Sequence, residues 1–184
     1  MRKCAIDASD ICLARGWSTR GRTLKEIDET LPEVVKNFLR KGAKLENITL
    51  HANGRWTHEG SPIENRNVAK AFHRHIDRTQ GGTWVIHMAP YTYPIEVEDV
   101  GFFVERVSVD GNMLELDLLG ETRLELDAAG LVFEEPDRLY IDLPNGYRAR
   151  FLRSAYNTVM QYLDQDERGY VLDFGEKTYV LKPL

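Results

Sequence analysis

Five histidines are the residues in this sequence best suited to metal or acid–base chemistry, and His73 and His75 are the closest pair. Residues two apart on a helix point to different sides, so this pair cannot chelate a metal as an i, i+4 pair would. We therefore predict no metal site. The sequence also lacks a Gly-rich phosphate loop, and we expect no bound cofactor.

His58 has a more suggestive position, because it lies three residues before Ser61. Ser61, Pro62 and Glu64 fit the pattern of a helix that starts with a serine cap. The free N–H groups at such a helix start could hold an anion, with Gly60 letting it approach the backbone and His58 donating to it. The alternative is that these residues only cap the helix and His58 ends a strand.

Carboxylates gather at Glu96, Glu98 and Asp99 and could serve in acid–base catalysis. Glu96 and Glu98 alternate with Ile95 and Val97, however, which favours the solvated face of a strand.

Nucleophilic catalysis has little support in the sequence. Ser61 does not lie in a Gly-x-Ser-x-Gly motif, and no Ser or Cys has a recognisable arrangement of His and Asp. An alternative hypothesis is a hydrolase that uses His58 with Glu59 or Glu98.

The elements that must position these residues form two similar series. Residues 53–97 and 137–182 each read strand, helix, strand, turn, strand, which predicts an internal duplication. The matches are Ala71-Phe72 with Ala155-Tyr156, 84 positions apart, and Trp84 and Tyr93 with Tyr170 and Tyr179, 86 positions apart. We expect the aromatic residues mostly in the core, with some lining a groove between the copies.

Local signals predict the remaining elements. Asn53-Gly54 and Asp110-Gly111 are typical hairpin turns, and the strands around the second hairpin predict an antiparallel meander. Before them, Thr23 with Glu26 and Thr30 with Glu33 have capping-box spacing, and Gly42 ends a helix. That helix would pack against the core through its apolar residues, namely Leu31, Val34, Val35, Phe38 and Leu39.

We therefore predict an α+β fold in which two related β-α-β-β units are joined by an antiparallel β-meander. The expected divisions are a leader (1–22), an N-terminal helical segment (23–47), the first repeat unit (48–100), and the meander with the second repeat unit (101–184).

Composition points to a soluble, cytoplasmic protein. The chain has 184 residues, 42% of them hydrophobic, and a net charge of -5, which argues against nucleic-acid binding. Cys4 and Cys12 lack a second pair for a zinc site, so we expect reduced thiols. No apolar run approaches the roughly 18 residues of a membrane span, and no signal peptide is evident.

Two stretches resemble the bacterial family of domain of unknown function 1285: GlyArgTrpThrHisGluGlySerProIle at 54–63 and ProIleGluValGluAspValGlyPhePheVal at 94–104. The resemblance covers about residues 48–184. It implies a duplicated fold, a C-terminal half similar to pleckstrin homology domains, a site for a nucleotide-like ligand where the halves meet, and a part in signal transduction. It implies no catalytic residue. The positions that match the first motif, to which we carry the ligand site, are Arg55, Trp56, His58, Gly60, Ser61 and Pro62; we carry it more weakly to Glu98 and Asp99 of the second stretch.

Our leading hypothesis is thus a non-enzymatic sensor or regulatory protein that binds a small anionic ligand, of the nucleotide type, between its halves. Arg55 and His58 would supply positive charge, Trp56 a stacking face, and Gly60 with Ser61 backbone donors. One alternative is a protein-interaction module with no small-molecule ligand. The other is the hydrolase described above.

Overall fold

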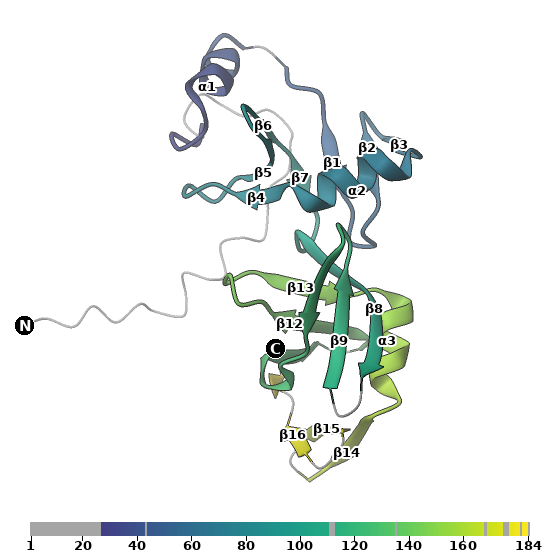
Figure 1. Cartoon of the computed structure of the whole chain (residues 1–184). Helices are drawn as coiled ribbons and strands as arrows, with labels where there is room; N and C mark the ends of the chain where they lie inside the picture. The colour runs from purple at the N-terminus through teal and green to yellow at the C-terminus, as the bar shows by residue number, and fades with distance from the viewer. Residues whose placement is uncertain are drawn as a thin grey trace, which may run out of the picture.

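The computed structural model describes residues 27–42, 44–110, 113–134, 136–167, 169–174, 177–180 and 182–183. These residues form two stacked bodies that follow each other along the chain (Figure 1). We call residues 48–97 the first unit and residues 102–183 the second unit. The predicted leader and the Thr23–Glu26 pair lie outside the described residues.

The first unit combines a small mixed sheet, a helix and a three-stranded antiparallel sheet. The mixed sheet has the strand order β3-β2-β1-β7, and the second sheet has the order β4-β5-β6. The elements are β1 (Ile48–Leu50), β2 (Trp56–His58), β3 (Ser61–Pro62), α2 (Arg66–Arg74), β4 (Ile76–Arg78), β5 (Trp84–Met88), β6 (Tyr91–Pro94) and β7 (Glu96–Val97).

The second unit is larger because the predicted hairpin extends its main sheet, whose order is β10-β9-β8-β13-β12-β11-β17. A helix and the small sheet β14-β15-β16 complete the unit. The elements are β8 (Phe102–Asp110), β9 (Met113–Leu118), β10 (Thr122–Glu125), a 3-10 helix (Ala128–Gly130), β11 (Leu131–Glu134), β12 (Arg138–Asp142), β13 (Arg148–Phe151), α3 (Arg153–Met160), β14 (Leu163–Asp166), β15 (Gly169–Phe174), β16 (Lys177–Val180) and β17 (Lys182–Pro183).

The two units share one order of elements. In the first, β3-β2-β1-β7 is combined with α2 and β4-β5-β6; in the second, β13-β12-β11-β17 is combined with α3 and β14-β15-β16. The last strand of each pairs parallel with the first, as β7 with β1 and β17 with β11. Registers also agree, because Ile86 pairs with Tyr93 and Leu172 with Tyr179, at the 86-residue offset seen in the sequence. The parallel pairings were not predicted.

The first unit's helix starts later than predicted. Ser61 and Pro62 form β3, which pairs with β2, and the helix cap is Asn65, whose side chain accepts hydrogen bonds from two backbone N–H groups. Glu59 (φ 47°) and Gly60 (φ 80°) both have positive φ, as the central residues of a tight hairpin turn require. The predicted serine cap is therefore wrong, because this turn folds Ser61 back along β2.

The N-terminal helix α1 (Glu33–Arg40) also differs from the prediction. Thr30 donates its N–H and hydroxyl to Asp28, so the capping box with Glu33 does not form. No residue of α1 is buried, and Val34 and Phe38 are 67% and 54% exposed. Of the apolar residues predicted to face the core, Leu31 is buried at 4% exposure, but it precedes α1, and the prediction is wrong for the helix itself.

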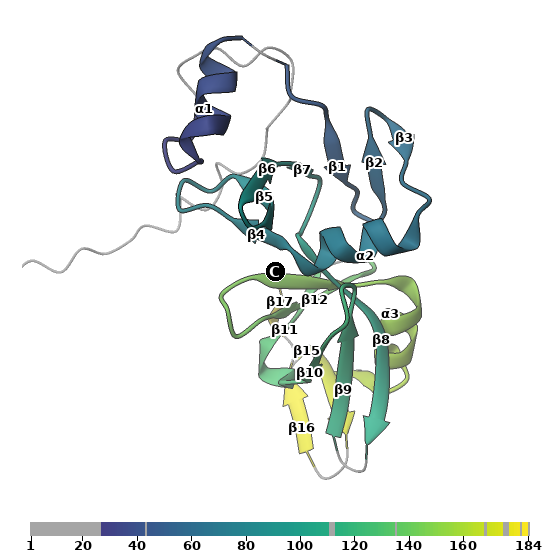
Figure 2. The same ribbon diagram turned by 45° about the horizontal axis from the view of Figure 1, so that its top comes forward.

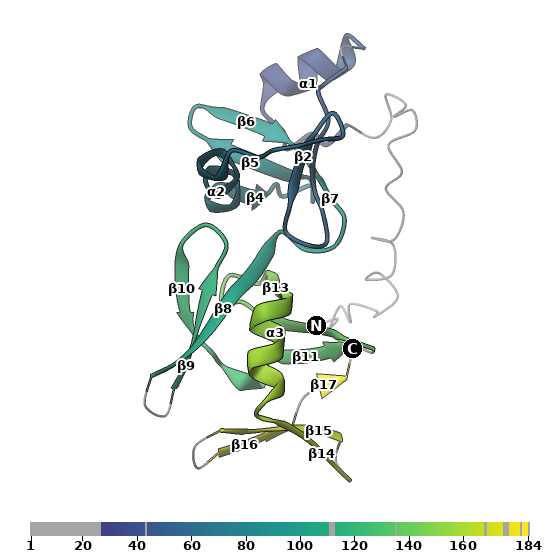
Figure 3. The same ribbon diagram turned by 90° about the vertical axis from the view of Figure 1, so that its right-hand side faces the viewer.

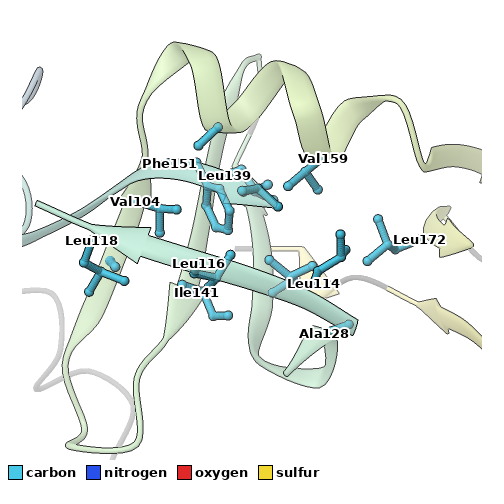
Figure 4. Close-up of a cluster of buried hydrophobic side chains, with 14 of the residues drawn as sticks. Val104, Leu114, Leu116, Leu118, Ala128, Leu139, Ile141, Phe151, Val159 and Leu172 are labelled. Atoms are coloured by element: carbon cyan, nitrogen blue, oxygen red, sulfur yellow. The ribbon is translucent and has the colours of Figure 1, made fainter. Parts of the chain in front are cut away.

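Two hydrophobic clusters form the core, and β8 contributes to both. Phe103 is buried in the cluster of the first unit, while the next residue, Val104, is buried in that of the second. Neighbouring residues of a strand point to opposite faces, so β8 links the two clusters. The second cluster lies between the large sheet and α3, where Figure 4 shows Leu139, Phe151 and Val159 below the helix.

Candidate functional site: a cleft between the units

An open cleft of about 580 Å³ lies between the two units. One wall is the β1–β2 turn of the first unit, and the other is the junction of β13 and α3 in the second unit. Figure 3 shows α3 running across the face of the large sheet. The lining residues are Ala52, Asn53, Arg55, Asp137, Arg150, Phe151, Leu152, Arg153, Ser154 and Tyr156. We call this the interunit cleft.

The β1–β2 turn positions Arg55 at this cleft. The Asn53 side chain accepts a hydrogen bond from the Arg55 N–H (3.0 Å), and the Gly54 N–H donates to the His51 carbonyl (2.9 Å). Gly54 has φ 78°, and a Cβ atom there would lie 2.9 Å from the Leu119 side chain of the second unit. The predicted hairpin is therefore confirmed, and its turn packs directly against the second unit.

Arg150 reaches the cleft from β13 and is held by Asp99. Its Nη1 lies 2.9 Å from Asp99 Oδ2, and the Tyr140 hydroxyl donates to the same oxygen at 3.1 Å. Burial and the Asp99 charge raise the pKa of Tyr140 to about 12, so the phenol stays protonated as a donor. Asp99 thus holds the Arg150 guanidinium in place at the cleft.

The N-terminus of α3 forms part of the cleft wall. The capping residue is Leu152, which makes no side-chain cap, so the first N–H groups of α3 have no side-chain acceptor. Arg153, the first residue of the helix, lies 4.0 Å from Asp137 and over the ring of Tyr156. The positive end of the helix dipole adds to the arginine charges.

Charge in the cleft is opposite to that of the chain as a whole. The lining contains Arg55, Arg150 and Arg153 but only one carboxylate, Asp137, whereas the chain has a net charge of -5. Leu152 and Tyr156 provide apolar surface beside these charges. Such an arrangement attracts an anion that also has an apolar or planar part.

Among the residues predicted from the sequence, Arg55 lies in the cleft but Trp56 does not. The Trp56 side chain is 2% exposed, and its indole N–H donates to His73 Nε2 at 3.0 Å. It cannot offer a stacking face to a ligand, because α2 covers it through His73 and Phe72. Tyr156 provides the aromatic ring that borders the cleft instead.

His58 and the residues after it lie in the β2–β3 hairpin and not among the residues that line the cleft. His58 Nε2 lies 2.7 Å from Glu46, while the Glu59 carboxylate accepts from the Asn47 N–H at 2.6 Å. The hydrogen-bond partner of His58 is therefore Glu46, and not Glu59 or Glu98 as the hydrolase hypothesis expects. Gly60, Ser61 and Pro62 do not form the predicted anion site, because no helix begins there.

Glu98 and Asp99 do not line the cleft, but each binds a residue that does. The Glu98 carboxylate accepts from the Ala52 N–H at 2.9 Å and lies 2.7 Å from His51 Nδ1. The Ala52 N–H and the His51 ring hold the pKa of Glu98 below its usual range, although partial burial opposes them. Glu98 therefore braces the loop that contains Ala52, while Asp99 holds Arg150.

Sequence reasoning missed the contribution of the second unit to the cleft. A signal exists in β13, where Arg148 and Arg150 alternate with the buried Ala149 and Phe151. This alternation places both arginines on one face of the sheet but cannot show that the first unit faces Arg150.

The described residues hold no group of three or more His, Cys, Asp or Glu side chains arranged to bind a metal ion. Within the same residues, no helix has both the length and the apolar character needed to cross a membrane.

The fold and the cleft define an α+β protein of two similarly ordered units with an arginine-rich recess between them. Two solved structures are similar to this chain. A DUF1285 family protein from Silicibacter pomeroyi DSS-3 has a TM-score of 0.59 and 16% identity, over 74% of this chain and 79% of that one. A DUF1285 family protein from Shewanella baltica OS155 has a TM-score of 0.52 and 17% identity, over 64% of this chain and 92% of that one.

These similarities confirm, at the level of the fold, the family resemblance found in the sequence. No family model matches the chain, and no curated protein matches it.

Proposed function

We propose that this protein binds a small anionic ligand of the nucleotide class in the interunit cleft and acts as a sensor or regulatory protein in signal transduction. The observation that carries the proposal is the set of three arginines, from both units, around one open recess. Guanidinium groups bind phosphate in bidentate fashion, and the N–H groups at the start of α3 add further donors. Tyr156 would contact the planar part of the ligand.

Arg55 is the residue on which recognition should depend most directly. It is exposed, and the described part of the chain shows no ion pair that engages its side chain. Arg150 is held by Asp99, and Arg153 is close to Asp137. A phosphate group in the cleft could therefore bind Arg55 without breaking an existing ion pair.

Thermal unfolding with nucleoside monophosphates, nucleoside diphosphates and inorganic phosphate tests this proposal. A ligand at 100 times its Kd should stabilise the fold by about 2.7 kcal/mol. Arg55→Ala and Arg153→Ala should lose this stabilisation. Arg106→Ala is the matched control, because Arg106 is exposed on β8 and does not line the cleft. The proposal fails if no anion shifts the wild-type transition, or if Arg55→Ala responds as the wild type does.

A duplication of one ancestral unit is also part of this proposal. It is supported by the common strand order of the two units and the shared 86-residue register. In this view the cleft arose where the two copies meet. The similarity of the second half to pleckstrin homology domains stays a prediction, which a structural superposition with such a domain would test.

A further inference from the structure

A continuous line of hydrogen bonds crosses the first sheet from a carboxylate through a histidine to a hydroxyl. Glu98 Oε1 lies 2.7 Å from His51 Nδ1, and His51 Nε2 lies 2.9 Å from Thr57 Oγ1. Sheet topology brings the three together: His51 follows β1, Thr57 lies in β2, and Glu98 follows β7, with β1 between the other two strands.

The donors and acceptors in this line can be assigned from their chemistry. The Ala52 N–H donates to the second oxygen of Glu98, and this bond helps to keep the carboxylate ionised. An ionised carboxylate only accepts hydrogen bonds, so the proton of the neutral imidazole must be on Nδ1. His51 Nε2 then carries a lone pair, and the Thr57 hydroxyl donates to it.

Solvent and small molecules can reach these groups. The side chains of His51 and Glu98 are 32% and 48% exposed. Thr57 is half-buried, and it points away from the core because its neighbour Trp56 is buried on the other face of β2. The hydroxyl is thus held in one orientation at an accessible surface.

Two other histidines of the described residues have part of this arrangement. Among these residues, His58 lies 2.7 Å from Glu46 and shows no hydroxyl partner, while His87 Nδ1 lies 2.7 Å from Thr92 Oγ1 and shows no carboxylate partner. In the part of the chain that the structure describes, His51 is the histidine bonded to both kinds of group. The partial versions therefore serve as internal controls.

We propose that Thr57 is a nucleophile, activated by His51 and positioned by Glu98, that attacks activated carboxylic esters. Thr57 Oγ attacks the carbonyl carbon while its proton passes to His51 Nε2. The ester C–O bond then breaks, and His51 returns the proton to the leaving oxygen, giving an alcohol and acyl-Thr57. Water attacks the acyl group by the same proton relay, which releases the carboxylic acid and restores Thr57.

This activity uses none of the three arginines of the interunit cleft, although Glu98 also holds the Ala52 loop of that cleft. The test is to incubate the full chain with p-nitrophenyl acetate, follow p-nitrophenol release, and locate the acetyl group by mass spectrometry. Acetylation is expected at Thr57 and not at Thr92, whose partner His87 shows no carboxylate partner among the residues that the structure describes. Equal acetylation of the two threonines would overturn the proposal.

Variants separate the roles of the residues. Thr57→Val and His51→Gln should lower p-nitrophenol release at least about 100-fold, the usual contribution of a general base and its nucleophile. Thr57→Ser should remain active. The matched controls His58→Gln and His87→Gln should leave acetylation of Thr57 unchanged. Unaltered acetylation of Thr57 in folded His51→Gln protein would also contradict the proposal.

The role of Glu98 in orienting His51 is tested by a measurement that a purely structural role would leave unchanged. In the wild type, nitrogen chemical shifts of the His51 ring should report the Nδ1–H tautomer. Glu98→Gln should abolish this tautomer preference and reduce acetylation of Thr57, while the thermal transition shows that the variant is folded. An Nε2–H tautomer in the wild type would exclude His51 as the base.

Discussion

His73 is a histidine buried in the core of the first unit, at 5% exposure. The Trp56 indole N–H lies 3.0 Å from its Nε2, and the Gly54 carbonyl lies 3.1 Å from the same atom. Burial lowers the pKa of His73 to about 4, against the opposing effect of the Gly54 carbonyl. The ring is therefore neutral at pH 7, and we assign Nε2 as the acceptor for Trp56, since an indole N–H can only donate.

The stability of the fold should therefore fall on acidification between about pH 6.5 and pH 4. In this window the unfolded His73 binds a proton and the folded one does not, so lower pH favours unfolding. The loss should approach about 3 kcal/mol at pH 4, from 1.36 kcal/mol per pKa unit. Urea unfolding at several pH values measures this slope.

The matched variants for this measurement are His73→Gln and His75→Gln. His73→Gln should flatten the slope between pH 6.5 and 4.5. His75→Gln should retain it, because His75 is only partly buried at the end of α2. An unchanged slope in His73→Gln would show that another group causes the acid sensitivity.

At the scale of elements, the β9–β10 turn of the second unit packs against α2 of the first, which Figure 2 shows at the junction of the units. Gly120 in this turn has φ 97°, and a Cβ atom there would lie 2.9 Å from the Arg74 backbone nitrogen. The next residue, Glu121, pairs with Lys70 and Arg74 of α2. Close approach of the two backbones depends on the missing side chain.

Gly120→Ala should therefore destabilise the protein more than a glycine substitution in an open turn. We expect a loss of about 3 kcal/mol, from backbone strain plus the clash with α2. Gly146→Ala is the control, since Gly146 has φ 81° but no atom within 4 Å of its Cβ position. It should lose about 1 kcal/mol, from strain alone. Equal losses in chemical denaturation would mean that the turn moves away from α2 at little cost.

The N-terminal helix α1 depends on a tether outside itself. Asp28 accepts hydrogen bonds from Thr30 and from Thr79 in the β4–β5 turn, and the Gly81 N–H donates to Thr30 Oγ1 at 2.9 Å. Burial raises the pKa of Asp28, but the hydroxyls of Thr30, Thr79 and Thr83 outweigh burial and hold the pKa below its usual range. The tether compensates for the lack of buried residues in α1.

Asp28→Ala should release α1 from the first unit without unfolding the rest. Amide exchange over residues 33–40 should accelerate about tenfold or more, while the global transition changes little. Glu29→Ala is the control, because Glu29 pairs with Lys36 and Arg40 at the exposed surface, where ion pairs contribute little. Equal exchange rates in the two variants would contradict the tether.

Elements with local signals could be predicted from the sequence, and elements defined by distant partners could not. Asn53-Gly54 was recognised because its turn chemistry is encoded in two adjacent residues. The Glu59–Gly60 turn was missed because Gly-Ser-Pro equally fits a helix start. Arg55 directly follows the Asn53-Gly54 turn, so the hairpin signal also fixes its place in the fold. Arg150 and Arg153 could not be assigned to the cleft, because only the packing of the units brings them there.

At the scale of the whole molecule, an aromatic stack joins the units. Phe102 of β8 and Tyr147 of the β12–β13 turn stack at 5.2 Å between ring centroids, and Trp84 of β5 lies 5.6 Å from Tyr147. The Tyr147 hydroxyl also donates to Asp77 of β4 at 2.9 Å. The stack adds to the connection that Phe103 and Val104 make through β8. The units should therefore unfold together.

Tyr147 allows this cooperativity to be tested with a graded pair of variants. Tyr147→Phe keeps the stacked ring and loses only the bond to Asp77, which should cost about 1 kcal/mol. Tyr147→Ala removes the ring as well, and for a partly buried aromatic side chain we expect a loss of about 2–3 kcal/mol. Scanning calorimetry should give one transition for the wild type and the Phe variant, and a broadened or split transition for the Ala variant. If the Ala and Phe variants unfold alike, the stack does not couple the units, and their cohesion must come from β8 and from contacts such as that of the β9–β10 turn with α2.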